Sequence, residues 1–336
     1  MKFKRYTLPV LIFTCIVIMA GCRSSLYHRC EGFVWGIMYH ITYRGDAFLE
    51  DSIHRIFDSI SGTLSIFDEG SVVSRLNNAD SLEVNDMFIE VYKASKRIHE
   101  ASQGMFDPTL SPLITAWGFG PGHKVLPDTA KVDSILNFVG LEKTRLNGHT
   151  LYKDDRRIEF NFSAIAKGYG CDEVARMLKR NGVSDFMVEI GGEITLGGKS
   201  PSGKDWKISI DVPDEKNASH EAFTLLSLTD CGIATSGNYR NYRRENGLII
   251  GHTVSPLTGR PVISDILSAT IIASNCMEAD AIATACMAIG LQKSKEMLPS
   301  LGVEVLLIMA DSTWATPGLS RMISEEVSEP GNINRD

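Results

Sequence analysis

The sequence predicts a globular domain that mixes α-helices and β-strands, and three observations support this. Stretches with helical periodicity alternate along the chain with short apolar or alternating stretches typical of strands. The 336 residues are 43% apolar and 22% charged, which is an ordinary globular composition. No internal repeat or low-complexity tract interrupts the sequence. This length is sufficient for one large domain or for two subdomains.

The stretch 161–193 predicts a strand end, a loop of small residues, a helix, a strand and a glycine pair followed by an acid. Ser163 is the predicted N-cap of the helix, and Gly182 follows its basic last turn. Apolar residues at helical spacing predict its buried face: Cys171, Val174, Ala175 and Leu178.

The start of this helix is a candidate phosphate site. A turn of small residues that opens a helix leaves backbone N–H groups free to bind an anion. Lys167 lies in the first turn, where a cation opposes the helix dipole. The alternative is a tightly packed helix start with a solvated lysine. Gly191 and Gly192 would let the backbone approach a ligand, although glycine pairs also simply make turns.

Periodicity and turn signals predict the remaining elements. Asn275 and Glu278 are spaced as in a capping box, and a meander is expected over 143–160. The predicted helices cover 47–61, 86–102, 131–139 and 277–289, with another from 292. The predicted strands cover 33–43, 185–190, 206–212, 222–228, 249–255, 269–274 and 303–309.

The first 22 residues predict a bacterial lipoprotein signal. A basic start (Lys2, Lys4 and Arg5) precedes the apolar stretch 8–19, and two small residues stand immediately before Cys22. We therefore expect residues 1–21 to be removed, Cys22 to be lipidated and 22–32 to form a tether. The alternative is an uncleaved anchor.

Net charge and cysteine spacing limit the classes of partner and of structural site that this chain can have. Without residues 1–21 the chain keeps 31 basic and 41 acidic residues, a net charge of −10, which argues against a nucleic-acid partner. The cysteines are too widely spaced for a disulfide framework or a zinc pattern. Cys171, Cys276 and Cys286 lie among apolar residues and are expected in the core.

Several short motifs, in their order along the chain, resemble those of the ApbE family, the FAD-dependent protein FMN transferases. Any one of them is weakly specific, whereas the ordered set, from about residue 33 to 322, is highly specific. The motifs are Leu64-Ser65-Ile66-Phe67, Ser74-Arg75-Leu76-Asn77, Phe106-Asp107-Pro108-Thr109, Trp117-Gly118-Phe119-Gly120, Ala164-Ile165-Ala166-Lys167-Gly168, Gly191-Gly192-Glu193, Ala234-Thr235-Ser236-Gly237, His252-Thr253, Pro256-Leu257-Thr258-Gly259 and Glu278-Ala279-Asp280-Ala281.

The resemblance implies an α+β fold with mixed sheets, packed helices and two subdomains around a central cleft, over residues 33–324. Residues 325–336 are expected to form a flexible tail. The implied reaction splits FAD at its pyrophosphate with Mg²⁺, passes FMN to a threonine or serine hydroxyl of an acceptor flavoprotein, and releases AMP. The implied location is the extracytoplasmic side of a membrane.

The resemblance also implies roles for particular residues. Asp280, Thr284 and the Ala164 carbonyl occupy metal-ligand positions, and His252 occupies the position of the base that activates the acceptor hydroxyl. Eight residues occupy FAD-contact positions: Trp35, Phe67, Met105, Phe106, Asp107, Asn161, Lys167 and Thr253.

The residue types agree with these roles without deciding them. Asp280 and Thr284 are spaced i, i+4, so their oxygens share one helix face and suit Mg²⁺. The alternative is that Asp280 serves a helix N-terminus and Thr284 bonds back to a carbonyl. Histidine is the residue type suited to general-base work near neutral pH, which supports a role for His252, but a lone histidine on a strand is more often structural.

The sequence departs from the family pattern at three places. The family usually has Met-Gly-Thr at residues 35–37, where this chain has Trp-Gly-Ile. It usually has Asp where this chain has Asn161, and Asp or Asn where it has Ser255. These departures concern the flavin pocket more than the reaction.

Two rival functions remain open at this point. One is a metal-dependent FAD pyrophosphatase, in which water replaces the acceptor hydroxyl. The other is a non-catalytic flavin-binding lipoprotein. Release of AMP that depends on Mg²⁺ separates binding from chemistry, and a covalently fluorescent acceptor separates transfer from hydrolysis.

The lipoprotein signal makes a direct prediction. Cys22→Ala should abolish lipidation, because stable anchoring by acyl chains depends on their covalent attachment to this residue. Radiolabelled fatty acid incorporation and membrane fractionation measure this. A Cys22→Ala chain that is still lipidated, or a native chain found in the cytoplasm, contradicts the prediction.

Overall fold

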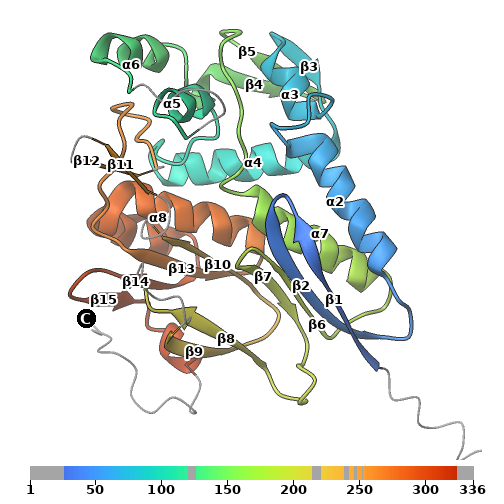
Figure 1. Cartoon of the computed structure of the whole chain (residues 1–336). Helices are drawn as coiled ribbons and strands as arrows, with labels where there is room; N and C mark the ends of the chain where they lie inside the picture. The colour runs from blue at the N-terminus through green and yellow to red at the C-terminus, as the bar shows by residue number, and fades with distance from the viewer. Residues whose placement is uncertain are drawn as a thin grey trace, which may run out of the picture.

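The computed structural model describes residues 26–119, 126–213, 221–237, 242–245, 248–251 and 253–323. Its centre is an eight-stranded antiparallel sheet in the order β1-β2-β6-β7-β10-β13-β14-β15 (Figure 1). The α+β class is therefore confirmed. The strands of this sheet are β1 (Leu26–Val34), β2 (Ile37–Gly45), β6 (Phe186–Ile190), β7 (Glu193–Gly197), β10 (Gly232–Gly237), β13 (Ser268–Ala273), β14 (Glu304–Ile308) and β15 (Thr313–Ala315).

Helices cover one face of the sheet and a hairpin covers the other (Figure 1). The helices are α2 (Glu50–Leu64), α7 (Ala166–Arg180) and α8 (Cys276–Met297), and the hairpin joins β8 (Trp206–Asp211) to β9 (Ala222–Leu228). Inward residues of β8 and β9 pack with Ile233 and Leu306 in a separate apolar cluster. The part of the sheet that holds β10 and β14 is thus covered on both faces.

A smaller layer lies beyond the helices (Figure 1). It holds a three-stranded sheet in the order β3-β5-β4 and four helices. The division of the chain into two subdomains stays a prediction. The elements of this layer are α3 (Val72–Asn77), β3 (Ser81–Glu83), α4 (Asp86–Ala101), α5 (Ser111–Ala116), α6 (Thr129–Leu136), β4 (Thr144–Asn147) and β5 (Thr150–Lys153). The other short elements are β11 (Tyr242–Glu245), β12 (Leu248–Gly251) and the 3₁₀ turns Leu141–Lys143, Leu298–Ser300 and Leu319–Arg321.

The predicted strand over 33–43 is wrong, because the chain reverses inside it. Val34 pairs with Ile37, and Trp35 (φ 51°) and Gly36 (φ 79°) form a two-residue turn between β1 and β2. Positive φ at both positions is typical of hairpin turns, but it is unusual for tryptophan. β1 also begins at Leu26, within the range 22–32 predicted as tether.

The predicted buried face of α7 is confirmed, since its four apolar residues are buried. The predicted N-cap is wrong: Ile165 occupies that position without a side-chain bond, and the Ser163 hydroxyl donates to Asn161. The capping residue of α8 is confirmed, because the Asn275 side chain accepts from the N–H of Glu278. Cys171, Cys276 and Cys286 lie in the core as predicted.

The predicted signal peptide, Cys22 and the tail 325–336 lie outside the described residues. Within the described ranges, no helix combines the length and apolar character needed to cross a membrane.

A buried lysine holds the small layer together. Lys153 is 7% exposed, and its ammonium donates to the carbonyls of Leu76 (3.0 Å), Asn77 (3.2 Å), Arg156 (2.9 Å) and Ile158 (2.8 Å). Burial lowers the pKa of Lys153, although nearby carboxylates oppose this. The Lys153 side chain therefore links the end of α3 to the loop that holds Arg156 and Ile158.

Lys153→Met should destabilise the protein by about 3 kcal/mol, because it leaves buried carbonyls without donors. Urea unfolding followed by circular dichroism measures the change. Lys143→Met is the matched control, since Lys143 also donates to backbone carbonyls but is less buried. Equal, small effects of the two substitutions would contradict the structural role of Lys153.

Candidate active site at the start of two helices

The N-termini of α7 and α8 lie in direct contact, and glycine makes this possible. A Cβ atom at Gly168 in α7 would lie 2.3 Å from the carbonyl oxygen of Cys276, the first residue of α8. A Cβ atom at Gly232 of β10 would lie 2.1 Å from the backbone nitrogen of Cys276. Any larger residue at either position would push the backbones apart.

Each helix supplies a carboxylate to the start of the other. Asp172 of α7 accepts hydrogen bonds from the N–H groups of Cys276 (3.0 Å) and Met277 (2.9 Å). Asp280 of α8 accepts one through Oδ2 from the N–H of Gly168 (3.1 Å). The first N–H groups of a helix lack intrahelical partners, and the helix dipole favours negative charge there. Asp280 thus serves a helix N-terminus, but that of α7 rather than its own.

Lys167 lies between two buried carboxylates. Its ammonium is 2.6 Å from Oε1 of Glu193, at the start of β7, and Glu193 and Asp280 are each 3% exposed. Burial lowers the pKa of Lys167, but the charges of Asp280 and Glu193 outweigh this and raise it to about 12. Burial, together with the charge of Asp280, raises the pKa of Glu193 to about 8, although Lys167 opposes this. A further cation here would favour the ionised form of both carboxylates.

Two further oxygen donors belong to the same helix starts as Asp280. Thr284 lies one turn after Asp280 in α8, and its hydroxyl is 3.4 Å from that of Ser236 at the end of β10. No described backbone donor bonds to the Ala164 carbonyl, which lies just before the N-cap of α7. Carboxylate, hydroxyl and carbonyl oxygens are hard donors, and they suit Mg²⁺ shared with phosphate oxygens. The residues present therefore fit such an ion.

The β1–β2 turn packs against the first turns of α7. The Trp35 indole donates to the Ser61 hydroxyl (2.9 Å) and lies so close to Gly170 that a Cβ there would be 2.7 Å from its ring. Ile37 packs in the same way on Gly191, where a Cβ would be 2.6 Å from Cδ1 of Ile37. The hairpin thus contacts both α7 and the β6–β7 turn.

The loop after α4 borders the segment that leads into α7. The N–H of Asn161 donates to the carbonyl of Pro108 (2.8 Å). The Asn161 side-chain oxygen accepts from the N–H (2.9 Å) and the hydroxyl (2.6 Å) of Ser163. This turn directs the chain toward Ala164 and Lys167.

Comparisons with known proteins agree with this geometry. The model of the ApbE family matches residues 35–307. The chain belongs to the ApbE family. It is 33% identical over 308 residues to the FAD:protein FMN transferase of Vibrio cholerae, a match covering 88% of this chain and 91% of that protein. It is 30% identical over 314 residues to the FAD:protein FMN transferase of Escherichia coli K12, covering 88% and 89% of the two chains.

Solved structures of the family share the fold. The flavin transferase ApbE from Vibrio cholerae superimposes with a TM-score of 0.81 at 30% identity, covering 89% of this chain and 99% of that one. The apo flavinyl transferase ApbE of Pseudomonas stutzeri gives 0.81 at 27% identity, covering 90% and 98%. The family resemblance of the motifs is therefore confirmed.

The departures from the ApbE pattern keep the local geometry. At position 161 an aspartate would accept the same bonds from Ser163, so Asn161 preserves this turn and removes only a charge. The Ser255 hydroxyl accepts from the N–H groups of Leu257 and Thr258 (3.3 Å each), as an aspartate or asparagine would. Tryptophan at position 35 adds a large ring against Gly170.

The aromatic FAD-contact positions of ApbE proteins differ in exposure here. The Phe67 ring is 81% exposed, in the loop between α2 and α3, so it is free to stack on a ligand. Phe106 is 3% exposed and its ring packs in the main core, whereas Met105 is partly buried. The FAD contacts of these residues stay predictions.

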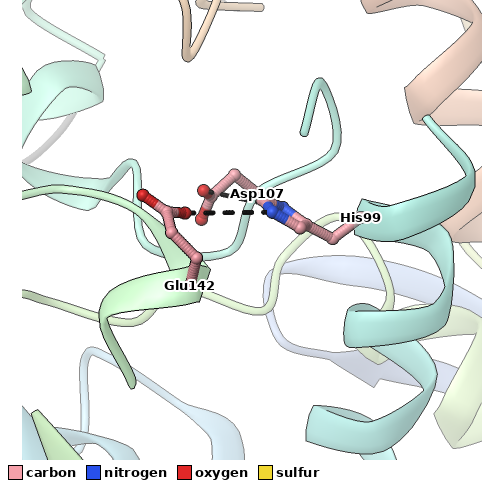
Figure 2. Close-up of side chains that lie close together, drawn as sticks. All are labelled: His99, Asp107 and Glu142. Carbon is pink, nitrogen blue, oxygen red and sulfur yellow. Dashed lines mark ion pairs between the residues drawn. The ribbon is translucent and has the colours of Figure 1, made fainter. Parts of the chain in front are cut away.

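The Asp107 carboxylate is held by protein donors. It accepts from the N–H and hydroxyl of Thr109 (2.7 Å each) and from the N–H of Leu141 (3.0 Å). Burial raises the pKa of Asp107, although these bonds oppose it. Figure 2 shows the His99 ring facing the carboxylates of Asp107 and Glu142. One potential ligand atom from each of the three lies within 4.8 Å of the others. Since the Nδ1 of His99 donates to the carbonyl of Phe106 (2.9 Å), this group chiefly fixes the loop after α4.

Thr253 lies in a loop that α5 and α6 hold. Trp117, which follows α5, donates through its indole to the carbonyl of Gly259 (2.6 Å). A Cβ at Gly259 would lie 2.5 Å from Val132 of α6, and the Thr253 carbonyl accepts from Val262 (2.9 Å). Two family motifs, around Trp117 and Gly259, are thus bonded to each other. His252 lies outside the described residues, so its role stays a prediction.

Sequence reasoning missed Asp172, Ser236 and Glu193 as members of this region. Glu193 and Ser236 stand within the family motifs and Asp172 stands on the predicted helix, which could have pointed to them. Each one, however, contacts a residue far away in the sequence, and only the structure shows these contacts. The sequence placed Lys167 and Asp280 in one site only through the family resemblance, and in the structure the two side chains interact electrostatically.

Proposed function

We propose that this chain is an FAD:protein FMN transferase that uses Mg²⁺ and acts on an acceptor flavoprotein outside the cytoplasmic membrane. The carrying observation is the start of α7, where the ammonium of Lys167 lies beside the buried carboxylates of Glu193 and Asp280. Such a place binds a pyrophosphate and a cation together. Relatives that match nearly the whole chain are FAD:protein FMN transferases, which supports this reaction.

The residues divide the work of binding. Lys167, at the start of α7, would hold the pyrophosphate of FAD through its ammonium. Asp280, Thr284 and the Ala164 carbonyl would hold Mg²⁺, and Phe67 would stack on a ring of FAD. When bound, Mg²⁺ neutralises the charge that develops on the pyrophosphate oxygens.

The proposed reaction depends on how these residues would place FAD relative to the acceptor hydroxyl. The acceptor hydroxyl oxygen forms a bond to the phosphorus of the FMN half, and the bond from this phosphorus to the bridging oxygen breaks. AMP leaves with that oxygen. His252 would accept the hydroxyl proton, as the resemblance implies. The loop that carries Thr253, fixed by Trp117 at Gly259, would keep this base in place.

Cys22 would anchor the chain to a membrane on its extracytoplasmic side, beside its acceptor. The lipoprotein signal supports this placement.

The experiment that tests the function mixes the full-length chain, in detergent, with FAD, Mg²⁺ and candidate acceptor domains. Flavin fluorescence that stays with the acceptor on a denaturing gel, with one AMP per flavin, is the expected result. His252→Ala should slow transfer by about 10²–10⁴-fold. Release of free FMN and AMP without a labelled acceptor would instead favour the pyrophosphatase. If no AMP is released and no acceptor is labelled, the result would favour a non-catalytic flavin-binding protein.

Asp280→Ala should nearly abolish activity at ordinary Mg²⁺ concentrations, whereas Thr284→Ala should be partly rescued by more Mg²⁺. Asp280 supplies the only formal charge among the proposed protein ligands, and Thr284 supplies a neutral hydroxyl. Release of AMP against Mg²⁺ concentration measures both variants.

Circular dichroism is the folding control for this pair. Alanine favours the helical conformation of α8, but Asp280 also caps α7, so Asp280→Asn is the second variant and keeps the bond to Gly168. A folded Asp280→Asn chain with wild-type Mg²⁺ dependence would remove Asp280 from the cation site.

A further inference from the structure

Glu193 brings a buried, half-satisfied carboxylate to the proposed cation site. It directly follows Gly191 (φ 63°) and Gly192 (φ 101°), and this turn delivers it to the start of β7. Its Oε1 accepts from Lys167 (2.6 Å). Its Oε2 is buried and has no hydrogen-bond partner among the described residues.

A buried carboxyl oxygen without a partner, such as Oε2 of Glu193, indicates that a ligand binds there. Leaving a buried carboxyl oxygen unbonded costs free energy, so native structures supply a partner, ordered water or an ion. The other buried polar atoms without a partner in the described part of the chain are hydroxyls: those of Ser95, Thr224 and Ser294. Glu193 is the carboxylate in this group, and its charged neighbours are Lys167 and Asp280.

We propose, on the basis of the function proposed above, that Glu193 is a positioning residue of the cation site. Its Oε2 accepts a hydrogen bond from water in the hydration shell of the ion, and its Oε1 holds Lys167 toward the pyrophosphate. Mg²⁺ keeps several of its waters in proteins, and carboxylates that bond to such a shell orient it and raise affinity. Glu193 therefore adds to the charge of Asp280 without being a direct ligand.

The competing explanation is that Glu193 only neutralises Lys167. Four proteins separate the two: the wild type, Glu193→Gln, Lys167→Met and the double variant. Mn²⁺ serves as the probe, because it prefers the same oxygen ligands and the electron paramagnetic resonance signal of the free ion reports binding directly. The full-length chain is titrated in detergent without FAD or acceptor.

Glu193→Gln should bind Mn²⁺ about 10–100-fold more weakly than the wild type. Lys167→Met should bind at least as tightly as the wild type, because it removes a positive charge. The double variant should be weaker than Lys167→Met by a similar factor. A double variant that binds as tightly as Lys167→Met would show that Glu193 acts only through Lys167, and an unchanged Glu193→Gln would remove it from the site.

The matched control is Glu173→Gln, which changes a mostly buried glutamate on α7 whose partner is Arg176 (2.5 Å) instead of Lys167. Its Mn²⁺ affinity should not change. Glutamine keeps the shape of Glu193, so circular dichroism should show a folded variant. A wild type that binds no Mn²⁺ overturns the cation site and this inference together. A wild type that binds Mn²⁺ but transfers no FMN overturns the proposed function alone.

Discussion

The start of α7 and the start of α8 each depend on a carboxylate that the other helix supplies. Asp172 caps α8, and Asp280 bonds to Gly168 in α7. These bonds satisfy N–H groups that are buried by the close approach at Gly168 and Gly232. Because both helices also pack on the central sheet, this exchange fixes the place where their positive dipole ends and acidic side chains meet.

The site also buries a second carboxylate, Glu193, which bonds to no helix N–H group in the described residues and pairs with Lys167. Glu193 and Asp280 are buried together, and burial raises the pKa of both. When such buried charged groups are replaced by well-packed apolar residues, the stability of a protein often stays the same or rises. Their presence around Lys167 is therefore better explained by a ligand with both anionic and cationic parts, such as a pyrophosphate with its metal ion. The same cluster gives Lys167 a fixed position.

Local patterns predicted the elements that carry the site, and long-range contacts decided the rest. The buried face of α7, the cap of α8 by Asn275 and the shared helix of Asp280 and Thr284 follow from spacing alone. The turn at Trp35 did not, because tryptophan rarely adopts positive φ and the apolar pattern continues through it. Glu193 and Asp172 could not be assigned either, since their partners lie on other elements.

The central claim is that a cation and a pyrophosphate bind together at the start of α7. The most direct test is a crystal structure of the full-length chain with FAD and Mn²⁺, in which anomalous scattering locates the metal. The account predicts the metal peak beside Asp280, Thr284 and the Ala164 carbonyl, with the pyrophosphate beside Lys167 at the start of α7. A metal peak elsewhere, such as beside His99 and Glu142, or a pyrophosphate away from α7, would contradict it.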